Sequence, residues 1–183
     1  MSTDDPQTLL DFWFAPGMQR HWFRSTPALD REIAKRFGET WRTGRDGKLA
    51  VWEQTPDGAL ALTVVLDQLP LNMFRGHPDS FSTEAQARAV ADRAIARGFD
   101  QGMPAERLQF LYMPFMHSES LADQERSVAL FEAAGLTENL RFARHHHDIV
   151  ARFGRFPHRN AILGRSSTPE EMAWLASPEG FNP

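Results

Sequence analysis

A capping residue followed directly by proline recurs along this chain and constrains its fold more than any other feature. The pairs are Asp5-Pro6, Thr26-Pro27, Thr55-Pro56 and Thr168-Pro169. Asp and Thr side chains accept hydrogen bonds from the free N–H groups at the start of a helix. Proline is favoured at the first helical position because its ring presets the backbone and it has no N–H that needs a partner. Each pair therefore predicts the start of an α-helix.

Apolar spacing and helix breakers extend these starts into a series of helices. From Thr26-Pro27, apolar residues recur every four positions and form a stripe that stops near Gly44. The expected helices cover residues 6–14, 27–44, 59–66, 83–98, 104–114, 121–134 and 137–153, with a last one starting at 168. No alternating polar and apolar run bounded by hairpin turns interrupts them. The sequence therefore predicts an all-α fold of about eight helices.

Two of these assignments depend on local detail. Residues 59–66 are apolar all round and are compatible with either a strand or a buried helix, but their Ala and Leu content and the preceding Thr55-Pro-Asp-Gly58 favour the helix. Thr83-Glu-Ala-Gln86 and Thr168-Pro-Glu-Glu171 each have the pattern of a capping box, in which the first and fourth residues bond to each other's backbone N–H. We expect both to open helices.

Composition limits the class of protein. A chain of 183 residues without a Gly-, Ser- or Pro-rich linker fits a single domain over residues 1–183. The absence of cysteine excludes disulfides, thiolate metal sites and a cysteine nucleophile. No apolar run approaches the roughly 18 residues of a membrane span, and the N-terminus has no basic, then apolar, leader. The sequence predicts a soluble, cytoplasmic protein without membrane association.

The strongest local signal is the basic segment 152–165. It contains four arginines, one histidine and no carboxylate, although the net charge of the chain is −4. Guanidinium groups stay charged and hold carboxylates or phosphates with a planar fork, so the partner is either an internal acid or an anionic ligand. Gly154 and Pro157 are expected to fix the loop and to present the polar side chains of Arg155, His158, Arg159 and Asn160.

Other polar residues are expected to join this loop in one cleft. The helical period places His146 in an apolar stripe with Phe142, Ile149 and Phe153, whereas His147 points away and His145 lies at the edge. Asp67 and Gln68 follow directly on the most apolar helix, where burial demands hydrogen-bond partners. The predicted catalytic residues are His117, His146 and His158, and the predicted ligand-binding residues are Asp67, Gln68, Asn72, Arg75, Glu119, Arg155, Arg159 and Asn160.

Three segments carry a resemblance to a known family. They are Leu66-Asp-Gln-Leu-Pro70 with Asn72 and Phe74-Arg-Gly76, then Met113-Pro-Phe-Met-His-Ser-Glu119, then Arg152-Phe-Gly-Arg-Phe-Pro-His-Arg-Asn160 with Leu163-Gly-Arg165. The chain resembles the bacterial domain-of-unknown-function family numbered 924, from Leu10-Asp-Phe-Trp-Phe14 almost to the C-terminus. The resemblance implies an all-helical, tetratricopeptide-like fold and no established activity. Leu71 stands where members usually carry arginine, which would weaken a ligand grip at that point.

Several functions fit this pattern. Arg155 and Arg159 could hold a small phosphate or carboxylate, with His117, His146 or His158 transferring protons near neutral pH in hydrolase or transferase chemistry. Alternatively, the same residues form a structural network in a non-enzymatic protein, or Arg75 and Arg155 clamp the carboxylate of an acidic peptide. A divalent metal on His117, Glu119 and His146 or His158 matches no standard ligand spacing. The predictions are a small anion or an acidic peptide as partner, and no metal, cofactor or nucleic acid.

Overall fold

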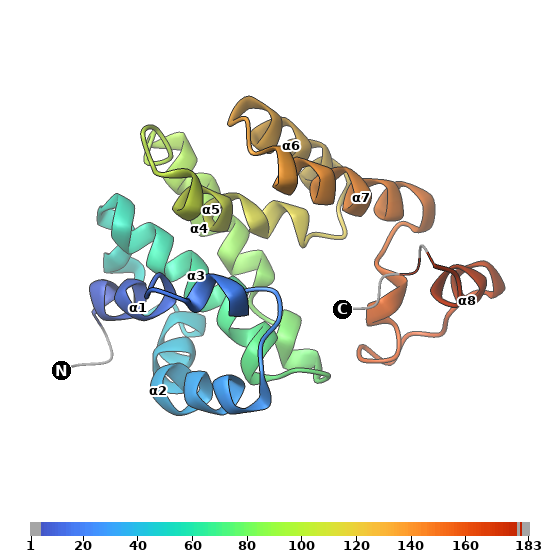
Figure 1. Ribbon diagram of the computed structural model, residues 1–183, viewed down its shortest axis with the longest axis horizontal. Coiled ribbons are helices and arrows are strands. Elements are labelled where there is room, and N and C mark those ends of the chain that lie inside the picture. Colours follow the sequence, from blue (N-terminus) through green and yellow to red (C-terminus); the bar gives the residue numbers. More distant parts are fainter. Residues whose placement is uncertain (1–4, 179, 181–183) are drawn as a thin grey trace. The chain divides into compact units, whose positions relative to one another are not determined.

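The computed structural model describes residues 5–178 and 180, and in this part of the chain every regular element is helical. Figure 1 shows the helices in chain order. The α-helices are α1 (Pro6–Trp13), α2 (Pro27–Arg45), α3 (Pro56–Met73), α4 (Glu84–Ala96), α5 (Ala105–Met116), α6 (Leu121–Ala133), α7 (Thr137–Phe153) and α8 (Pro169–Leu175). Short 3-10 helices lie between them: η1 (Met18–His21), η2 (Ala50–Gln54), η3 (Pro78–Phe81) and η4 (Pro157–Arg159). The predicted all-α fold is confirmed.

Each of the four capping pairs lies at a helix start, although α3 is longer than the predicted helix over residues 59–66, since it begins at Pro56 and ends at Met73. The side chain of Asp5 accepts a hydrogen bond from the Gln7 N–H at the start of α1. Thr26 and Thr55 accept from N–H groups in the first turns of α2 and α3. Thr168 forms a full capping box with Glu171 at the start of α8. In each case proline occupies the first helical position, so local sequence alone sets these four helix starts.

The chain divides into two compact units. The first contains Met1–Arg75 and Asp79–Pro114, and the second contains Gly76–Pro78 and Phe115–Pro183. The single domain over residues 1–183 therefore stays a prediction, and residues 1–4, 179 and 181–183 of it lie outside the described part. Among the described residues, no helix combines the length and apolar character needed to cross a lipid bilayer.

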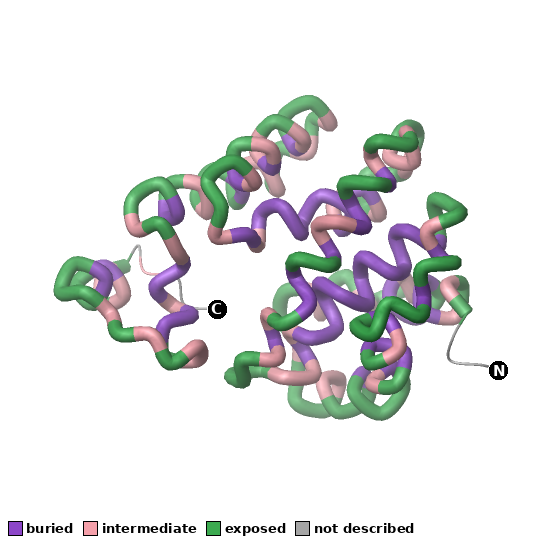
Figure 2. Tube along the Cα trace, turned by 180° about the vertical axis from the view of Figure 1, so that it is seen from behind, coloured by how far each residue is buried: buried purple, intermediate pink, exposed green. Residues whose placement is uncertain are grey.

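Helix α3 forms the centre of the first unit. It packs against α1, α2, α4 and η2, and nearly all of its side chains are buried (Figure 2). The choice of helix over strand for residues 59–66 is confirmed. The core around α3 is made of large apolar side chains that are almost fully buried: Leu9, Leu10, Trp13, Ile33, Phe37, Trp41, Leu60, Val65, Leu69, Phe110 and Leu111.

Thr83 does not form the predicted capping box. It stands at the N-cap of α4, but its side chain makes no capping hydrogen bond. Its buried hydroxyl instead donates to the Leu66 carbonyl of α3 at 2.5 Å and accepts from the Trp41 indole N–H at 3.3 Å. Two buried polar groups of neighbouring helices therefore take the hydroxyl away from the local cap, because a buried polar group without a partner is costly.

The second unit is built on the antiparallel pair α6 and α7, which pack along each other (Figure 1). Beyond α7, η4 packs against α8. A small apolar core joins the end of α7 to α8 and to the segment between α7 and η4. It consists of Ile149, Val150, Phe156 and Trp174, and it is flanked by Phe153 and Leu175. Phe142, expected in the buried stripe of α7, is 46% exposed, because the stripe meets this core only in its C-terminal half.

Candidate functional site

The segment that follows α7 carries most of the predicted site. Gly154 ends α7 in the left-handed conformation with φ of 69°, and its N–H donates to the Val150 carbonyl at 2.8 Å. Glycine adopts this conformation without the steric cost that a side chain would add. The turn leads into Phe156-Pro157 and η4, so His158, Arg159 and Asn160 lie on a short helical turn with fixed backbone geometry.

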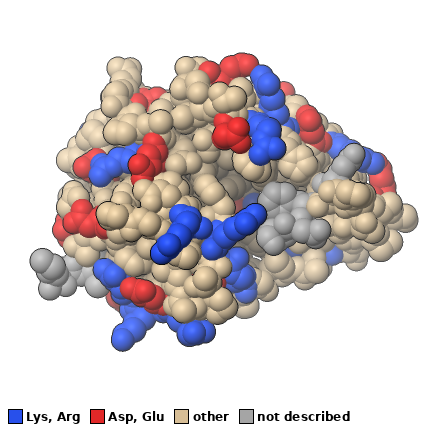
Figure 3. Space-filling model, in the orientation of Figure 1, with Lys and Arg blue, Asp and Glu red and all other residues tan. Residues whose placement is uncertain are grey.

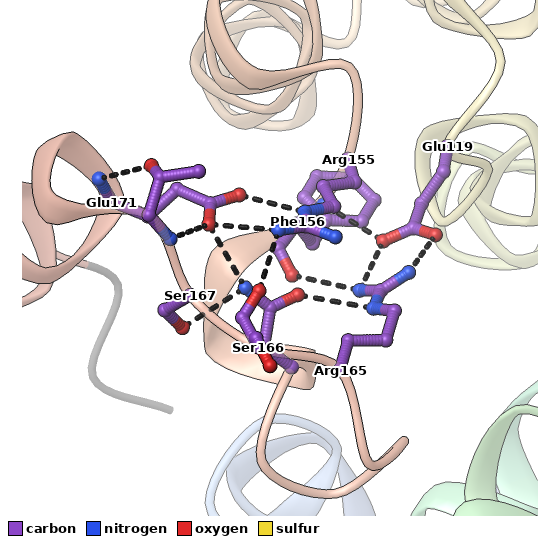
Figure 4. Close-up of polar contacts among 9 residues, drawn as sticks. Glu119, Arg155, Phe156, Arg165, Ser166, Ser167 and Glu171 are labelled. Atoms are coloured by element: carbon purple, nitrogen blue, oxygen red, sulfur yellow. Dashed lines mark hydrogen bonds and ion pairs between the residues drawn. The ribbon is translucent and has the colours of Figure 1, made fainter.

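Glu119 and Arg165 form one ion pair of the site (Figure 4). Arg165 donates from Nη1 to Glu119 Oε2 at 2.6 Å and from Nη2 to Glu119 Oε1 at 2.8 Å. Glu119 Oε1 also accepts from the Phe156 N–H at 2.7 Å. Burial raises the pKa of Glu119, but the hydrogen bonds from Arg165 and from the Phe156 backbone outweigh it and hold the pKa below its usual value.

Arg155 and Glu171 form a second, equally direct pair. Arg155 donates from Nε and Nη2 to the two carboxylate oxygens of Glu171 at 2.7 and 2.9 Å. The Thr168 N–H donates to Glu171 Oε2 at 2.7 Å. The Glu171 side chain is only 3% exposed. The hydrogen bonds from Arg155, and with them that from the Thr168 backbone, lower the pKa of Glu171 to about 2 despite this burial.

Asn160 connects the two pairs. Its Oδ1 accepts from Arg165 Nε at 3.0 Å, and its Nδ2 donates to Glu171 Oε2 at 3.2 Å and to Ser167 Oγ at 3.0 Å. The result is a continuous polar network from Glu119 to Arg155 (Figure 4). Three of the four arginines in segment 152–165 therefore have internal acids as partners: Arg152 pairs with Glu170, Arg155 with Glu171 and Arg165 with Glu119.

A second group of predicted residues lies around the ring of Phe156. The ring is fully buried. The imidazole of His146 meets it edge to face at 5.5 Å between ring centres, and that of His158 lies at 5.5 Å. The Arg159 guanidinium stacks on it at 4.7 Å and donates from Nη2 to the His117 carbonyl at 3.0 Å. The structure thus brings together His146, His158 and Arg159 with the backbone of His117, and we call these four residues and Phe156 the Phe156 cluster.

Two histidines of the Phe156 cluster are neutral at pH 7. Burial lowers the pKa of His146 to about 3 and outweighs the opposing hydrogen bond to the Phe142 carbonyl. Burial and the nearby positive charge of Arg159 lower the pKa of His158 to about 4. These values lie well below neutrality, so the two rings act as uncharged hydrogen-bonding groups and exchange few protons at pH 7.

The tautomer of His146 follows from its backbone contact. Its Nδ1 lies 2.8 Å from the Phe142 carbonyl oxygen. A carbonyl only accepts hydrogen bonds, so Nδ1 carries the proton. In the neutral ring Nε2 is then an acceptor. The Phe156 cluster therefore combines one guanidinium donor with an imidazole that can accept a proton or a hydrogen bond.

The remaining predicted ligand-binding residues belong to the first unit. Asp67, Gln68 and Asn72 are buried on α3, where Gln68 Nε2 donates to Asp67 Oδ2 at 2.7 Å and Asn72 Nδ2 donates to the Gln68 carbonyl at 3.1 Å. Arg75, at the end of α3, is exposed and donates to both oxygens of Asp30 on α2, at 3.1 and 3.4 Å. A cleft that joins these four residues to those of the second unit stays a prediction.

Paired charge is a general feature of the surface. Arg93 forms a bidentate pair with Glu53, and Arg107 pairs with Asp57. On the face that Figure 3 shows, basic and acidic atoms are accordingly interspersed. Within the described residues, which include His117, Glu119, His146 and His158, no three His, Cys, Asp or Glu side chains are grouped so that they could hold a metal ion.

Sequence reasoning missed Arg165, Glu171 and Phe156 as parts of the site. Arg165 lies in the basic segment, but no neighbouring residue indicates that its partner is Glu119, 46 positions earlier. Glu171 was expected only as the acidic member of a capping box. In the structure it has both roles, since it caps α8 and holds Arg155. The sequence pattern that could identify Glu171 as part of the site is a carboxylate at a helix start that follows closely on a cluster of arginines, because such arginines need acidic partners.

Comparison with known proteins identifies the family of this chain. A family described as "Bacterial protein of unknown function (DUF924)" matches residues 9–179. The chain belongs to this family. A solved structure of a protein of unknown function from Agrobacterium tumefaciens is 40% identical, with a TM-score of 0.89, and the match covers 93% of this chain and 96% of that chain. No curated protein matches the chain significantly. As a DUF924 protein it has a relative of the same helical fold, and the chemistry is argued from the residues themselves.

Proposed function

We propose that this DUF924 protein binds a small anion, a phosphate or a carboxylate, at the Phe156 cluster. The observation that carries the proposal is the gathering of Arg159, His146 and His158 around one buried ring. A guanidinium holds oxyanions with a planar fork of N–H donors, and an imidazole can donate from both nitrogens once it takes up a proton. The site would combine a fixed positive charge with two neutral rings next to it.

Arg159 is the arginine best suited to the ligand. Arg155 and Arg165 each donate to a carboxylate in a bidentate pair, which neutralises both charges. Arg159 is only 6% exposed, its guanidinium stacks on the Phe156 ring at the centre of the cluster, and one of its hydrogen bonds goes to the carbonyl of His117. A guanidinium in such surroundings interacts strongly with an added anion, because the low local dielectric screens charge poorly.

The low pKa values of His146 and His158 favour a binding role over a catalytic role in the protein without ligand. A negative charge placed beside an imidazole stabilises its protonated form and raises its pKa. Anion binding would therefore be accompanied by proton uptake on His146 or His158, and affinity should increase as pH falls below 7. Hydrolase or transferase chemistry would require that the bound anion raise the pKa of one of these rings to near neutral pH.

A second candidate is a non-enzymatic, tetratricopeptide-like module that binds a protein or an acidic peptide. The polar network favours it, because Glu119, Arg165, Asn160, Glu171 and Arg155 satisfy one another without any ligand. On this account the basic segment holds the end of α7 and α8 in place, and function lies on another surface.

A thermal-shift screen with inorganic phosphate, phosphorylated metabolites, carboxylates and acidic peptides distinguishes the two. Binding at about 100 times the dissociation constant adds about 2.7 kcal/mol, which raises the midpoint of a protein this size by roughly 5–10 °C. Arg159→Gln should abolish the shift, measured from the variant's own midpoint. Arg152→Gln, which removes the exposed pair with Glu170 and the stacking on Phe153 but leaves Arg159 in place, should retain it.

Two outcomes would count against anion binding. A wild-type protein that no compound stabilises would favour the structural network. An equal shift in wild type and Arg159→Gln would place the ligand elsewhere.

A further inference from the structure

The backbone of Phe156 is held at both its N–H and its carbonyl by one ion pair. Its N–H donates to Glu119 Oε1 at 2.7 Å, and its carbonyl accepts from Arg165 Nη2 at 3.2 Å. The same Oε1 and the same Nη2 are 2.8 Å from each other. The three groups therefore close a hydrogen-bonded ring in which the backbone of Phe156 cannot rotate without breaking a charge-assisted bond (Figure 4).

We call Glu119 and Arg165 the Phe156 clamp, because they hold the backbone of the residue whose ring lies at the centre of the proposed site. The backbone of Phe156 determines where its ring lies, and the ring contacts His146, His158 and Arg159. Phe156 is fully buried, so its ring has little freedom of its own. A shift of the Phe156 backbone would therefore displace the surface against which the three polar groups pack.

We infer that Glu119 and Arg165 are positioning residues of the anion site: they fix the backbone of Phe156 and, through its ring, arrange His146, His158 and Arg159. The inference rests on the proposed function. It assigns to Glu119 the role of a positioning residue and not that of a ligand-binding one, and it gives a role to Arg165. Neither side chain needs to touch the ligand.

The chain provides a matched control for a merely structural effect. Arg152 and Glu170 form an ion pair at 2.9 Å that also ties the end of α7 to α8. Both of these side chains are at least half exposed, and no hydrogen bond links them to Phe156. Arg152→Gln therefore removes an arginine of the same segment and leaves the Phe156 clamp intact.

The test uses Arg165→Lys, which keeps the charge and loses the fork, and Glu119→Gln, which keeps the shape and loses the charge. Two quantities are measured for each variant: the ring-proton chemical shifts of His146 and His158, and the dissociation constant for inorganic phosphate. We expect both variants to move the ring shifts and to weaken phosphate binding by about tenfold or more. Arg152→Gln should change neither.

The outcomes separate this inference from the proposed function. Variants that melt at a lower temperature but keep the wild-type ring shifts and phosphate affinity would overturn the positioning role. If the wild-type protein binds no phosphate, the proposed function fails for that ligand, and the ring shifts still decide the inference. Displaced shifts in Arg165→Lys would then support positioning, and unchanged shifts would overturn it.

Discussion

Glu171 both caps a helix through neighbours in the sequence and pairs with an arginine that lies far from it in the sequence. Its backbone and side chain complete the capping box with Thr168, while its carboxylate receives both donors of Arg155. A carboxylate that is almost fully buried is tolerated only because these partners offset its lost hydration. Asn160 adds a further hydrogen bond at 3.2 Å and extends the arrangement toward Arg165.

The stability of the protein should depend on pH through Glu171. Its pKa is about 2 in the folded protein, against an ordinary value of about 4.3 in an unfolded chain. The unfolded state therefore binds more protons between these values, so the stabilisation is complete above about pH 4.3 and is lost as pH falls toward 2. Urea unfolding at pH 7 and at pH 3 should show Glu171→Gln destabilised at pH 7 and much closer to wild type at pH 3. An equal gap at both pH values would contradict the role of the carboxylate.

At the scale of the element, α8 depends on a few side chains for its docking. It has seven residues, too few for a helix to be stable in isolation. Trp174, which is 6% exposed, packs with Ile149, Val150 and Phe156, and its ring lies 5.5 Å from that of Phe153. Together with the Arg155–Glu171 pair, this contact holds α8 in place.

Trp174→Ala should cost about 3 kcal/mol of unfolding free energy, at the low end for a buried tryptophan because α8 can separate locally. Denaturant unfolding measures the loss, and amide exchange should show faster exchange in α8. Met172→Ala on the same helix is the control. Met172 is 54% exposed, so its truncation should change stability by less than about 0.5 kcal/mol. Equal losses in the two variants would show that Trp174 does not dock α8.

Element starts were readable from the sequence because they depend on neighbours along the chain. Asp5, Thr26, Thr55 and Thr168 cap their helices through N–H groups two or three residues ahead. Thr83 has the same local pattern, but its hydroxyl serves Trp41 and the Leu66 carbonyl, which only tertiary packing brings near. The sequence predicts a ligand for Arg155 for a similar reason: the charge of Arg155 is visible in the sequence, whereas its pairing with Glu171 depends on tertiary packing.

At the scale of the whole molecule, the two units differ in how they are stabilised. The first is organised around α3, which is buried on nearly all sides. The second joins the α6–α7 pair to a short loop and α8 through a small apolar core and a polar network. Apolar burial excludes water from backbone hydrogen bonds more completely than a network of partly exposed ion pairs does.

Amide hydrogen exchange should therefore be slowest in α3 and fastest, among the α-helices, in α8. The stretch from Leu60 to Leu69 has every side chain buried, so exchange there should require global unfolding. Mass-spectrometric exchange of peptides covering α3, α7 and α8 would measure the order. Exchange in α8 as slow as in α3 would mean that the second unit opens only with the first.

The anion site itself is best tested through its histidines. The pH titration of the His146 and His158 ring protons, followed by nuclear magnetic resonance in chloride and then in phosphate or acetate, requires no knowledge of the natural ligand. A bound anion should raise the pKa of at least one of these rings from its free value of about 3 or 4, and Arg159→Gln should remove the effect. Titration curves that are identical in chloride, phosphate and acetate would contradict the account.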